Sequence, residues 1–311
     1  MLCGYKDLLK ALYDIYYTNI EQYSDVTSSH WREVGGHEAS WDKGVLTLKG
    51  AGFGDRLGDD WLRWCYSLPQ RFLLQSIISD YPNLKWIVEK AKYVAKRQGT
   101  IFSYDCLRQA LSLALMSQSL NDILSAKGAR ICIIGDGYGY LASLFKTVFP
   151  NIQVVEVNLG KTLLFDAAYV QKVFPNEDVL LLQDKKDCVD AQSGSASFLF
   201  LEAEHYDWIE ELKIDLFINI ASMQEMNLSV VQNYLQFMRN SKGDGKYFYC
   251  CNRIEKHLPD GEVVRFSEYG WQEDDKIVFD ELCPWYQKFP VPYPPFWKPF
   301  DGPIQHRLTQ L

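Results

Sequence analysis

Three glycines that alternate with other residues follow a short apolar run near the middle of the chain. The run covers residues 131–134, and the glycines are Gly135, Gly137 and Gly139. The run predicts a buried strand, and the residues after the turn have the pattern of a helix. A glycine turn between a strand and a helix N-terminus lets a ligand approach the backbone closely. We therefore predict that a nucleoside cofactor binds at this turn.

The residues of the turn discriminate between cofactors. Dinucleotide-binding turns follow G-x-G-x-x-G/A, where the last small residue lets helix and strand pack closely. Tyr140 stands at that position and is too large. The carboxylate of Asp136 would also repel a pyrophosphate. The spacing better suits the turn that holds S-adenosylmethionine, where Asp136 could pair with the ammonium or sulfonium charge. One residue departs from that pattern, because Ile133 stands where methyltransferases commonly carry an acid.

Two polar residues near the end of the next apolar run could hold the ribose of the cofactor. They are Glu156 and Asn158, which lie two residues apart and therefore share one face of a strand. Glu156 has the commoner distance from the glycines, whereas Asn158 is nearer the predicted strand end. The alternative for Glu156 is a surface charge at a strand edge, and both residues stay candidates.

Strands and helices alternate around the turn. The alternation predicts an α/β fold with a doubly wound, mostly parallel sheet. The predicted strands are 131–134, 152–158, 197–201, 215–221 and 246–252, and the helices between them are 140–149, 161–174, 206–212 and 228–239. Two weaker strands are expected near 262–266 and 276–279. The proline- and aromatic-rich residues 283–311 predict an extended segment.

The first hundred residues have a different character. Residues 1–100 predict an N-terminal, mainly helical cap region, with an irregular stretch over 27–58 and helices at 7–23, 61–79 and 84–97. Residues 101–311 form the predicted Rossmann-like methyltransferase domain with its extended C-terminal segment. Ser103 is expected to cap a helix over 104–120 ahead of the first sheet strand.

Composition narrows the class of protein. The 311 residues carry a net charge of −8, which argues against nucleic acid as a partner, because binding phosphates needs a cationic face. No apolar run reaches the ~20 residues that span a bilayer, and the first ten residues lack a signal-peptide pattern. We therefore expect a cytoplasmic protein with no membrane partner. Eight scattered cysteines without a C-x-x-C pair predict reduced thiols.

Five further segments resemble a bacterial family of sugar O-methyltransferases. They are residues 219–226, 247–253, 266–271, 282–285 and 301–308. The resemblance covers roughly residues 100–311 and is weaker before that. It implies a Rossmann-like methyltransferase fold, S-adenosylmethionine as cofactor and a carbohydrate hydroxyl as acceptor.

The carboxyl ends of the predicted strands should carry the site, because open parallel sheets bind ligands there. A residue after the third strand often meets the adenine in methyltransferases, so Ala203 and Glu204 are candidates. Asn219 and Ser222 follow the fourth strand. With Asp136, the three glycines and the two ribose candidates, these four residues complete the predicted cofactor-binding set.

Methyl transfer to a hydroxyl needs a base that removes the hydroxyl proton. Glu225 is the first candidate, because it follows the fourth strand on the expected acceptor side. His257 is second and His205 third, since histidine titrates near neutral pH. Glu225 could instead cap the helix at 228–239, and His257 could be a solvated loop residue. No spacing marks a divalent metal site, so we expect no metal.

Aromatic residues at 285–286 and 293–297 could form a platform for the sugar or a structural strap across the domain. Two other functions remain open: methylation of another small molecule, and a non-catalytic Rossmann-like binding module, which Ile133 favours and the glycine turn disfavours. Tyr140 disfavours a nicotinamide oxidoreductase. The sequence specifies neither the sugar and its hydroxyl nor the oligomeric state.

Overall fold

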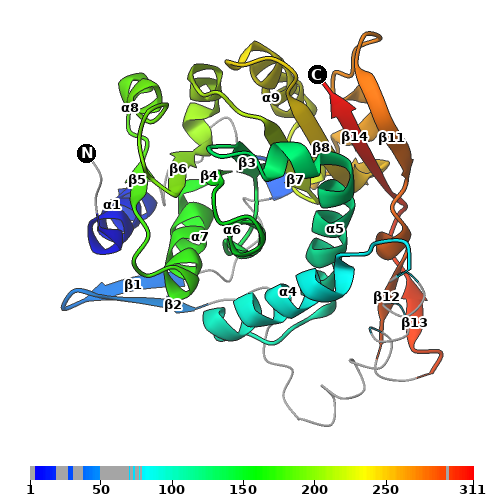
Figure 1. The fold of residues 1–311 in the computed structure, drawn as a ribbon, viewed down its shortest axis with the longest axis horizontal. Helices are drawn as coiled ribbons and strands as arrows, with labels where there is room; N and C mark the ends of the chain where they lie inside the picture. The colour runs from blue at the N-terminus through cyan, green and yellow to red at the C-terminus, as the bar shows by residue number, and fades with distance from the viewer. Residues whose placement is uncertain are drawn as a thin grey trace.

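A computed structural model describes residues 4–18, 27–30, 38–49, 70, 73, 77, 79–291 and 294–311. Its centre is an eight-stranded sheet with the strand order β11-β14-β8-β7-β3-β4-β6-β5 (Figure 1). The strands are β3 (Arg130–Ile134), β4 (Gln153–Asn158), β5 (Val179–Leu181), β6 (Phe198–Glu202), β7 (Leu216–Ile220), β8 (Tyr247–Arg253), β11 (Lys276–Leu282) and β14 (Ile304–Gln310).

The strands from β5 through β6, β4, β3 and β7 to β8 are all parallel. Only β14 and β11, at one edge, pair antiparallel with their neighbours in this sheet. The first strand of the series, β3, has β4 on one side and β7 on the other, so the order reverses there. This topology confirms the predicted doubly wound, mostly parallel α/β fold. Ligands of such sheets bind at the reversal.

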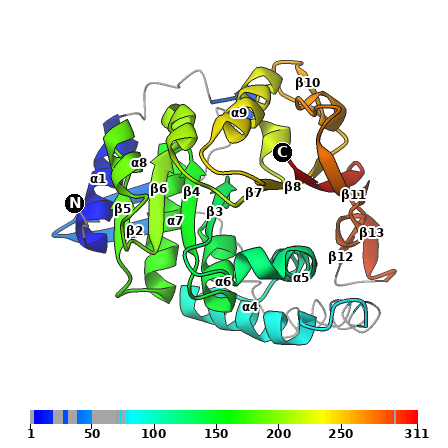
Figure 2. The same cartoon turned by 45° about the horizontal axis from the view of Figure 1, so that its top comes forward.

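Helices cover both faces of the sheet (Figure 2). Strand β3 shows the reason, because Ile131 and Ile133 enter one apolar core while Cys132 and Ile134 enter the other. The first core is shared with α4 (Leu84–Gln98), α5 (Tyr104–Leu124), α6 (Tyr140–Val148) and α7 (Gly160–Val173). The second is shared with α8 (Lys185–Asp190), the 3-10 helix η1 (Ala203–Glu211) and α9 (Leu228–Asn240).

Two helix ends follow directly from local sequence. Ser103 caps α5 as predicted, since its Oγ accepts the Cys106 N–H at 3.2 Å. Helix α5 runs past the predicted end at residue 120, with a kink at Leu120. Helix α4 ends at Gly99, whose φ of 79° suits glycine. No helix within the described residues is long and apolar enough to cross a membrane.

The N-terminal region contains a hairpin as well as helices. Helix α1 (Tyr5–Thr18) packs against α7 and β5. The expectation of an irregular stretch over 27–58 is wrong for β1 (Glu38–Asp42) and β2 (Val45–Lys49), which pair antiparallel. The turn residues Lys43 and Gly44 have φ of 47° and 81°, as a two-residue hairpin turn requires. The helix predicted at 61–79 falls largely outside the described residues.

The C-terminal segment is more regular than the prediction of an extended segment. Strand β14 lies between β8 and β11 and extends the sheet. Before it, β9 (Glu255–His257) pairs with β10 (Val263–Arg265), and β12 (Lys288–Pro290) pairs with β13 (Trp297–Pro299). Short 3-10 helices are η2 (Met223–Glu225), η3 (Phe266–Glu268) and η4 (Pro284–Tyr286). The helix predicted at 206–212 is the 3-10 helix η1.

Two aromatic residues of this segment form a strap rather than a sugar platform. Trp285 and Tyr286 are buried. The carbonyl oxygen of Trp285 accepts hydrogen bonds from the Tyr104 hydroxyl at 3.0 Å and from Arg108 Nε at 3.2 Å. The Trp285 indole donates to the Ser112 hydroxyl at 3.3 Å. These contacts tie the segment to α5 and leave neither ring face open to a ligand.

Candidate functional site

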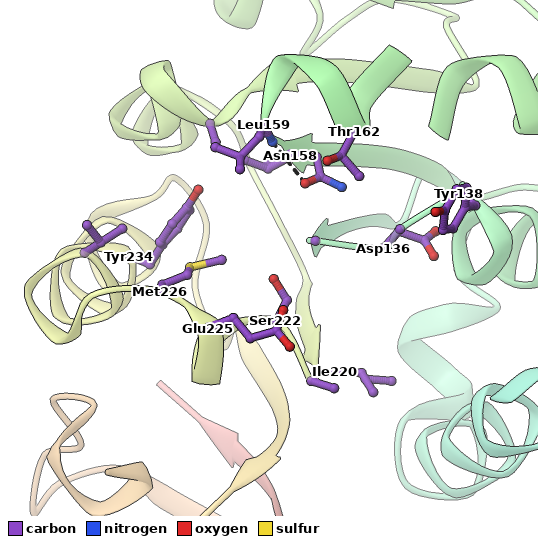
Figure 3. Close-up of a pocket in the computed structure, with 16 residues that line it drawn as sticks. Asp136, Tyr138, Asn158, Leu159, Thr162, Ile220, Ser222, Glu225, Met226 and Tyr234 are labelled. Atoms are coloured by element: carbon purple, nitrogen blue, oxygen red, sulfur yellow. Dashed lines mark hydrogen bonds between the residues drawn. The ribbon is translucent and has the colours of Figure 1, made fainter. Parts of the chain in front are cut away.

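A pocket lies at the carboxyl ends of β3, β4, β6 and β7, where the strand order reverses (Figure 3). We call its two sides the turn wall and the β7 wall. The turn wall comprises Gly135, Asp136, Gly137, Tyr138, Val157, Asn158, Leu159 and Thr162. The β7 wall comprises Ile220, Ala221, Ser222, Glu225, Met226, Val230 and Tyr234, and Ala203 lies between the two.

The glycine turn is required by close packing on both of its sides. Gly135 has φ 73°, and a Cβ there would lie 2.1 Å from Ser222 Oγ. Gly139 has φ 56°, and a Cβ there would lie 2.6 Å from the carbonyl oxygen of Asp166. Glycine therefore lets the turn approach the β7 wall on one side and α7 on the other. Gly139 itself does not line the pocket.

Asp136 caps helix α6, a role that the sequence analysis did not predict. Its Oδ1 accepts the Leu141 N–H at 2.9 Å, and its Oδ2 accepts the Ala142 N–H at 2.7 Å. Burial, and then the neighbouring Asp166 carboxylate, raise the pKa of Asp136 above its ordinary value, while the backbone hydrogen bonds oppose this. Asp136 lines the pocket, but both of its oxygens already hold the helix N-terminus.

Only one of the two ribose candidates reaches the pocket. Asn158 lines it, whereas Glu156 is fully buried and lies outside the lining. Glu156 points to the sheet face that carries α6 and α7, and neither of its oxygens has a hydrogen-bond partner among the described residues. Burial, with added repulsion from Asp136 and Asp166, raises the pKa of Glu156 well above its usual range. The alternative of a surface charge at a strand edge is therefore wrong.

Asp166 is a buried residue that sequence reasoning missed. Its Oδ1 accepts the Gly139 N–H at 3.0 Å, and its Oδ2 accepts Asn158 Nδ2–H at 2.8 Å. It thus joins the glycine turn to the end of β4. Burial raises the pKa of Asp166, against the effect of these hydrogen bonds. A single acid inside the apolar stretch 163–168 was the available signal.

Asn219 supports the loop after β7 rather than lining the pocket. Its Nδ2 donates to the Ile134 carbonyl at 2.8 Å, and its Oδ1 accepts the Met223 N–H at 3.0 Å. Asn252 Nδ2 also donates to this Oδ1 at 2.8 Å. Ser222 is positioned by this network and does line the pocket.

Glu225 lies on the β7 wall and faces a partner from the N-terminal region. Burial raises the pKa of Glu225 to about 7, although Lys256, a hydrogen bond with Gln224 and Arg253 oppose the rise. His30 Nε2 lies 3.5 Å from Glu225 Oε2. His30 was not among the predicted site residues, because nothing in the sequence places residue 30 beside residue 225.

The two predicted histidines and Glu204 lie outside the pocket lining. His257 is exposed on β9, with Nε2 3.2 Å from Glu255 Oε1. His205 stacks on Trp208, with ring centroids 4.2 Å apart. Glu204 is exposed on η1, while its neighbour Ala203 lines the pocket. The expectation that His257 would lie at the pocket mouth is wrong, because its hairpin carries it into solvent.

Within the residues that the structure describes, no group of three or more His, Cys, Asp and Glu side chains is placed to hold a metal ion. The described cysteines, which are Cys106, Cys132, Cys188, Cys250, Cys251 and Cys283, are buried free thiols.

No protein-family model and no curated protein matches the chain. Among solved structures it is similar to the mitomycin 7-O-methyltransferase MmcR, with a TM-score of 0.36 and 10% identity over 66% of this chain and 56% of that one. The methyltransferase CalO6 gives 0.40 and 10% over 63% and 60%. The complex of DhpI with SAH gives 0.36 and 8% over 72% and 94%. The chain thus spans less than two thirds of MmcR and CalO6. The strand order of the central sheet defines the fold.

Proposed function

We propose that the protein is an S-adenosylmethionine-dependent O-methyltransferase that acts on a sugar hydroxyl. The observation that carries the proposal is one pocket with a glycine turn on one wall and a partly buried carboxylate, Glu225, on the other. The pocket lies at the reversal of strand order, where such sheets bind ligands. The resemblance of residues 100–311 to sugar O-methyltransferases supplies the acceptor.

The residues of the turn wall suit this cofactor. Gly135 and Gly137 leave the backbone accessible, and apolar Val157 and Leu159 can flank an adenine ring.

 Asn158 uses one N–H on Asp166 and one oxygen lone pair on the Leu159 N–H. An amide has two of each, so one donor and one acceptor remain for a ribose hydroxyl. Ala203 leaves space beside the adenine position.

The β7 wall suits removal of a proton from the acceptor. S-adenosylmethionine, when bound, supplies an activated methyl group whose bonding electron pair stays on sulfur. Glu225 accepts the proton that leaves the acceptor hydroxyl. Because burial brings its pKa to about 7, Glu225 is poised to take up a proton near neutral pH. Ser222, beside it, can orient the hydroxyl.

A second acceptor class is favoured by the apolar part of the same wall. Met226, Val230 and Tyr234 line the pocket next to Glu225. Such side chains suit an aromatic or aliphatic alcohol better than a bare sugar ring. Methylation of another small molecule is therefore the second candidate function.

Two measurements test the proposal. Calorimetry with S-adenosylhomocysteine, NAD and NADP should show binding of the first alone. Transfer of a labelled methyl group from S-adenosylmethionine should then be measured with methyl glycosides and with simple phenols. Transfer to glycosides supports the sugar acceptor, and transfer to phenols alone supports the second candidate. Binding without transfer to either set favours a non-catalytic module, and absence of binding refutes the proposal.

A further inference from the structure

A short segment of the N-terminal region that includes His30 lies against the β7 wall. The Ser28 hydroxyl donates a hydrogen bond to the carbonyl oxygen of Glu225. Ser29 Oγ accepts the Asp260 N–H at 3.4 Å. The first contact ties the backbone beside His30 to the loop after β7, and the second ties it to the turn between β9 and β10, although the segment is remote from both in sequence.

The imidazole of His30 faces the carboxylate of Glu225. The distance of 3.5 Å between Nε2 and Oε2 is that of an ion pair and is longer than an ordinary hydrogen bond. The side chains are 23% and 21% exposed, so solvent screens their attraction less than it screens a surface pair. A titratable imidazole beside a titratable carboxylate makes a pair whose shared charge depends on pH.

The other groups that act on Glu225 do not have this property. Gln224 is neutral, and Lys256 and Arg253 are cationic side chains. Among these neighbours, His30 has the type of side chain whose unperturbed pKa lies between pH 5 and 8. It can therefore tune the carboxylate in the range where a base must work.

We propose that His30 is a positioning residue for Glu225, which stabilises the ionised carboxylate and directs it into the pocket. The inference rests on the proposed methyltransferase function, because it gives Glu225 the role of base. The hydroxyl proton moves from the acceptor oxygen to a Glu225 oxygen. His30 does not touch the acceptor and acts only through the carboxylate.

Histidine NMR titration of the full chain tests the pair without cofactor or acceptor. Glu225→Gln removes the negative charge, so the titration midpoint of His30 should fall by roughly 1 pH unit. His257, paired with Glu255 at 3.2 Å outside the pocket, is the matched control and should not move. If the His30 midpoint is the same in the wild-type protein and in E225Q, the proposal is overturned.

Kinetics of His30→Gln test the positioning role. We expect kcat to fall about tenfold or more for whichever methyl glycoside or phenol the wild-type protein methylates. The affinity for S-adenosylhomocysteine should stay within about twofold. The acid limb of the kcat–pH profile should move to higher pH, because the carboxylate loses its stabilising partner. His257→Gln should leave both unchanged.

A wild-type acid limb in H30Q would overturn the proposal even if kcat falls, since a merely structural loss does not need to shift the profile. One further result distinguishes failure of the proposed methyltransferase function from failure of the His30 proposal. If the wild-type protein binds no S-adenosylhomocysteine, the proposed function fails, and the NMR titration alone then decides whether the His30–Glu225 pair exists.

Discussion

The two walls of the pocket hold their carboxylates in different ways. On the turn wall, Asp136 accepts two N–H groups of α6, and behind it Asp166 accepts one from the turn. On the β7 wall, Glu225 faces His30, a side chain that itself titrates. Carboxylates fixed by backbone amides hold a loop in place, whereas a carboxylate with a titratable partner can exchange a proton. The carboxylates of the turn wall therefore hold the backbone in place, whereas Glu225 on the β7 wall is the carboxylate that we propose as the base.

The largest effect should come from Glu225→Gln. Glutamine keeps the shape of the side chain but cannot accept the proton, so methyl transfer should fall by about 10²–10⁴-fold. S-adenosylhomocysteine affinity, measured by calorimetry, should hardly change. Glu255→Gln, which alters the exposed pair on β9, is the control and should keep full activity. Equal activity of E225Q and the wild-type protein would remove the distinction between the walls.

Gly135→Ala should damage the place where the walls meet. The new Cβ would lie 2.1 Å from Ser222 Oγ, at a residue with positive φ. The φ strain alone costs roughly 1–3 kcal/mol, and the clash adds to it. Urea unfolding should show the loss of stability, and calorimetry should show weaker S-adenosylhomocysteine binding.

Ser222→Gly provides the control for the clash, because it removes both Ser222 atoms that the new Cβ would meet. The double variant G135A/S222G should recover the part of the stability that the clash costs and leave the φ strain. No recovery would mean that the close approach of the walls is not what requires glycine at position 135.

Asp166→Asn should loosen the turn wall. One carboxylate oxygen becomes an NH₂ group, which cannot accept from either Gly139 or Asn158. An unsatisfied buried group costs about 1–3 kcal/mol in the free energy of unfolding. Asn158→Ala should cost less in the wild-type background and almost nothing further in D166N, as a double-mutant cycle in urea would reveal. If the losses in unfolding free energy from the two substitutions were fully additive, Asp166 and Asn158 would not act together in connecting the glycine turn to β4.

Glu156→Met should make the protein more stable at alkaline pH. The pKa of Glu156 is raised by burial, so the stability it contributes is fully present below about pH 4 and is lost as the pH rises through the folded-state pKa. Methionine has no such dependence. The difference in unfolding free energy between E156M and the wild-type protein should therefore grow in favour of E156M from pH 5 to pH 9. A difference that is independent of pH would show that Glu156 does not titrate in this range.

The smallest effect should come from His257→Ala. His257 belongs to an exposed pair on β9 and lies outside the pocket. We expect no measurable change in methyl transfer or in the urea midpoint, since exposed ion pairs contribute little. A loss of transfer would bring the β9–β10 hairpin back into the site.

The sequence by itself determined the doubly wound sheet and the place of its glycine turn. Apolar runs and their helical partners repeat with clear periods, so the central strands and the Ser103 cap could be predicted locally. Strand β5 was missed because it has only three residues. Strand β14 was missed because it mixes Gln305, His306 and Arg307 with apolar residues, and it is a strand only because β8 and β11 lie on either side of it.

For the site, the sequence determined that Gly135, Asn158 and Glu225 follow strands that end at one edge. Tertiary structure decided which polar groups reach the pocket and in what state. It turned Glu156 into the core and carried His257 into solvent. It also brought His30 to Glu225 and Asp166 to the glycine turn. Direction, burial and partnership depend on contacts between segments far apart in the chain, and local sequence patterns carry no record of such contacts.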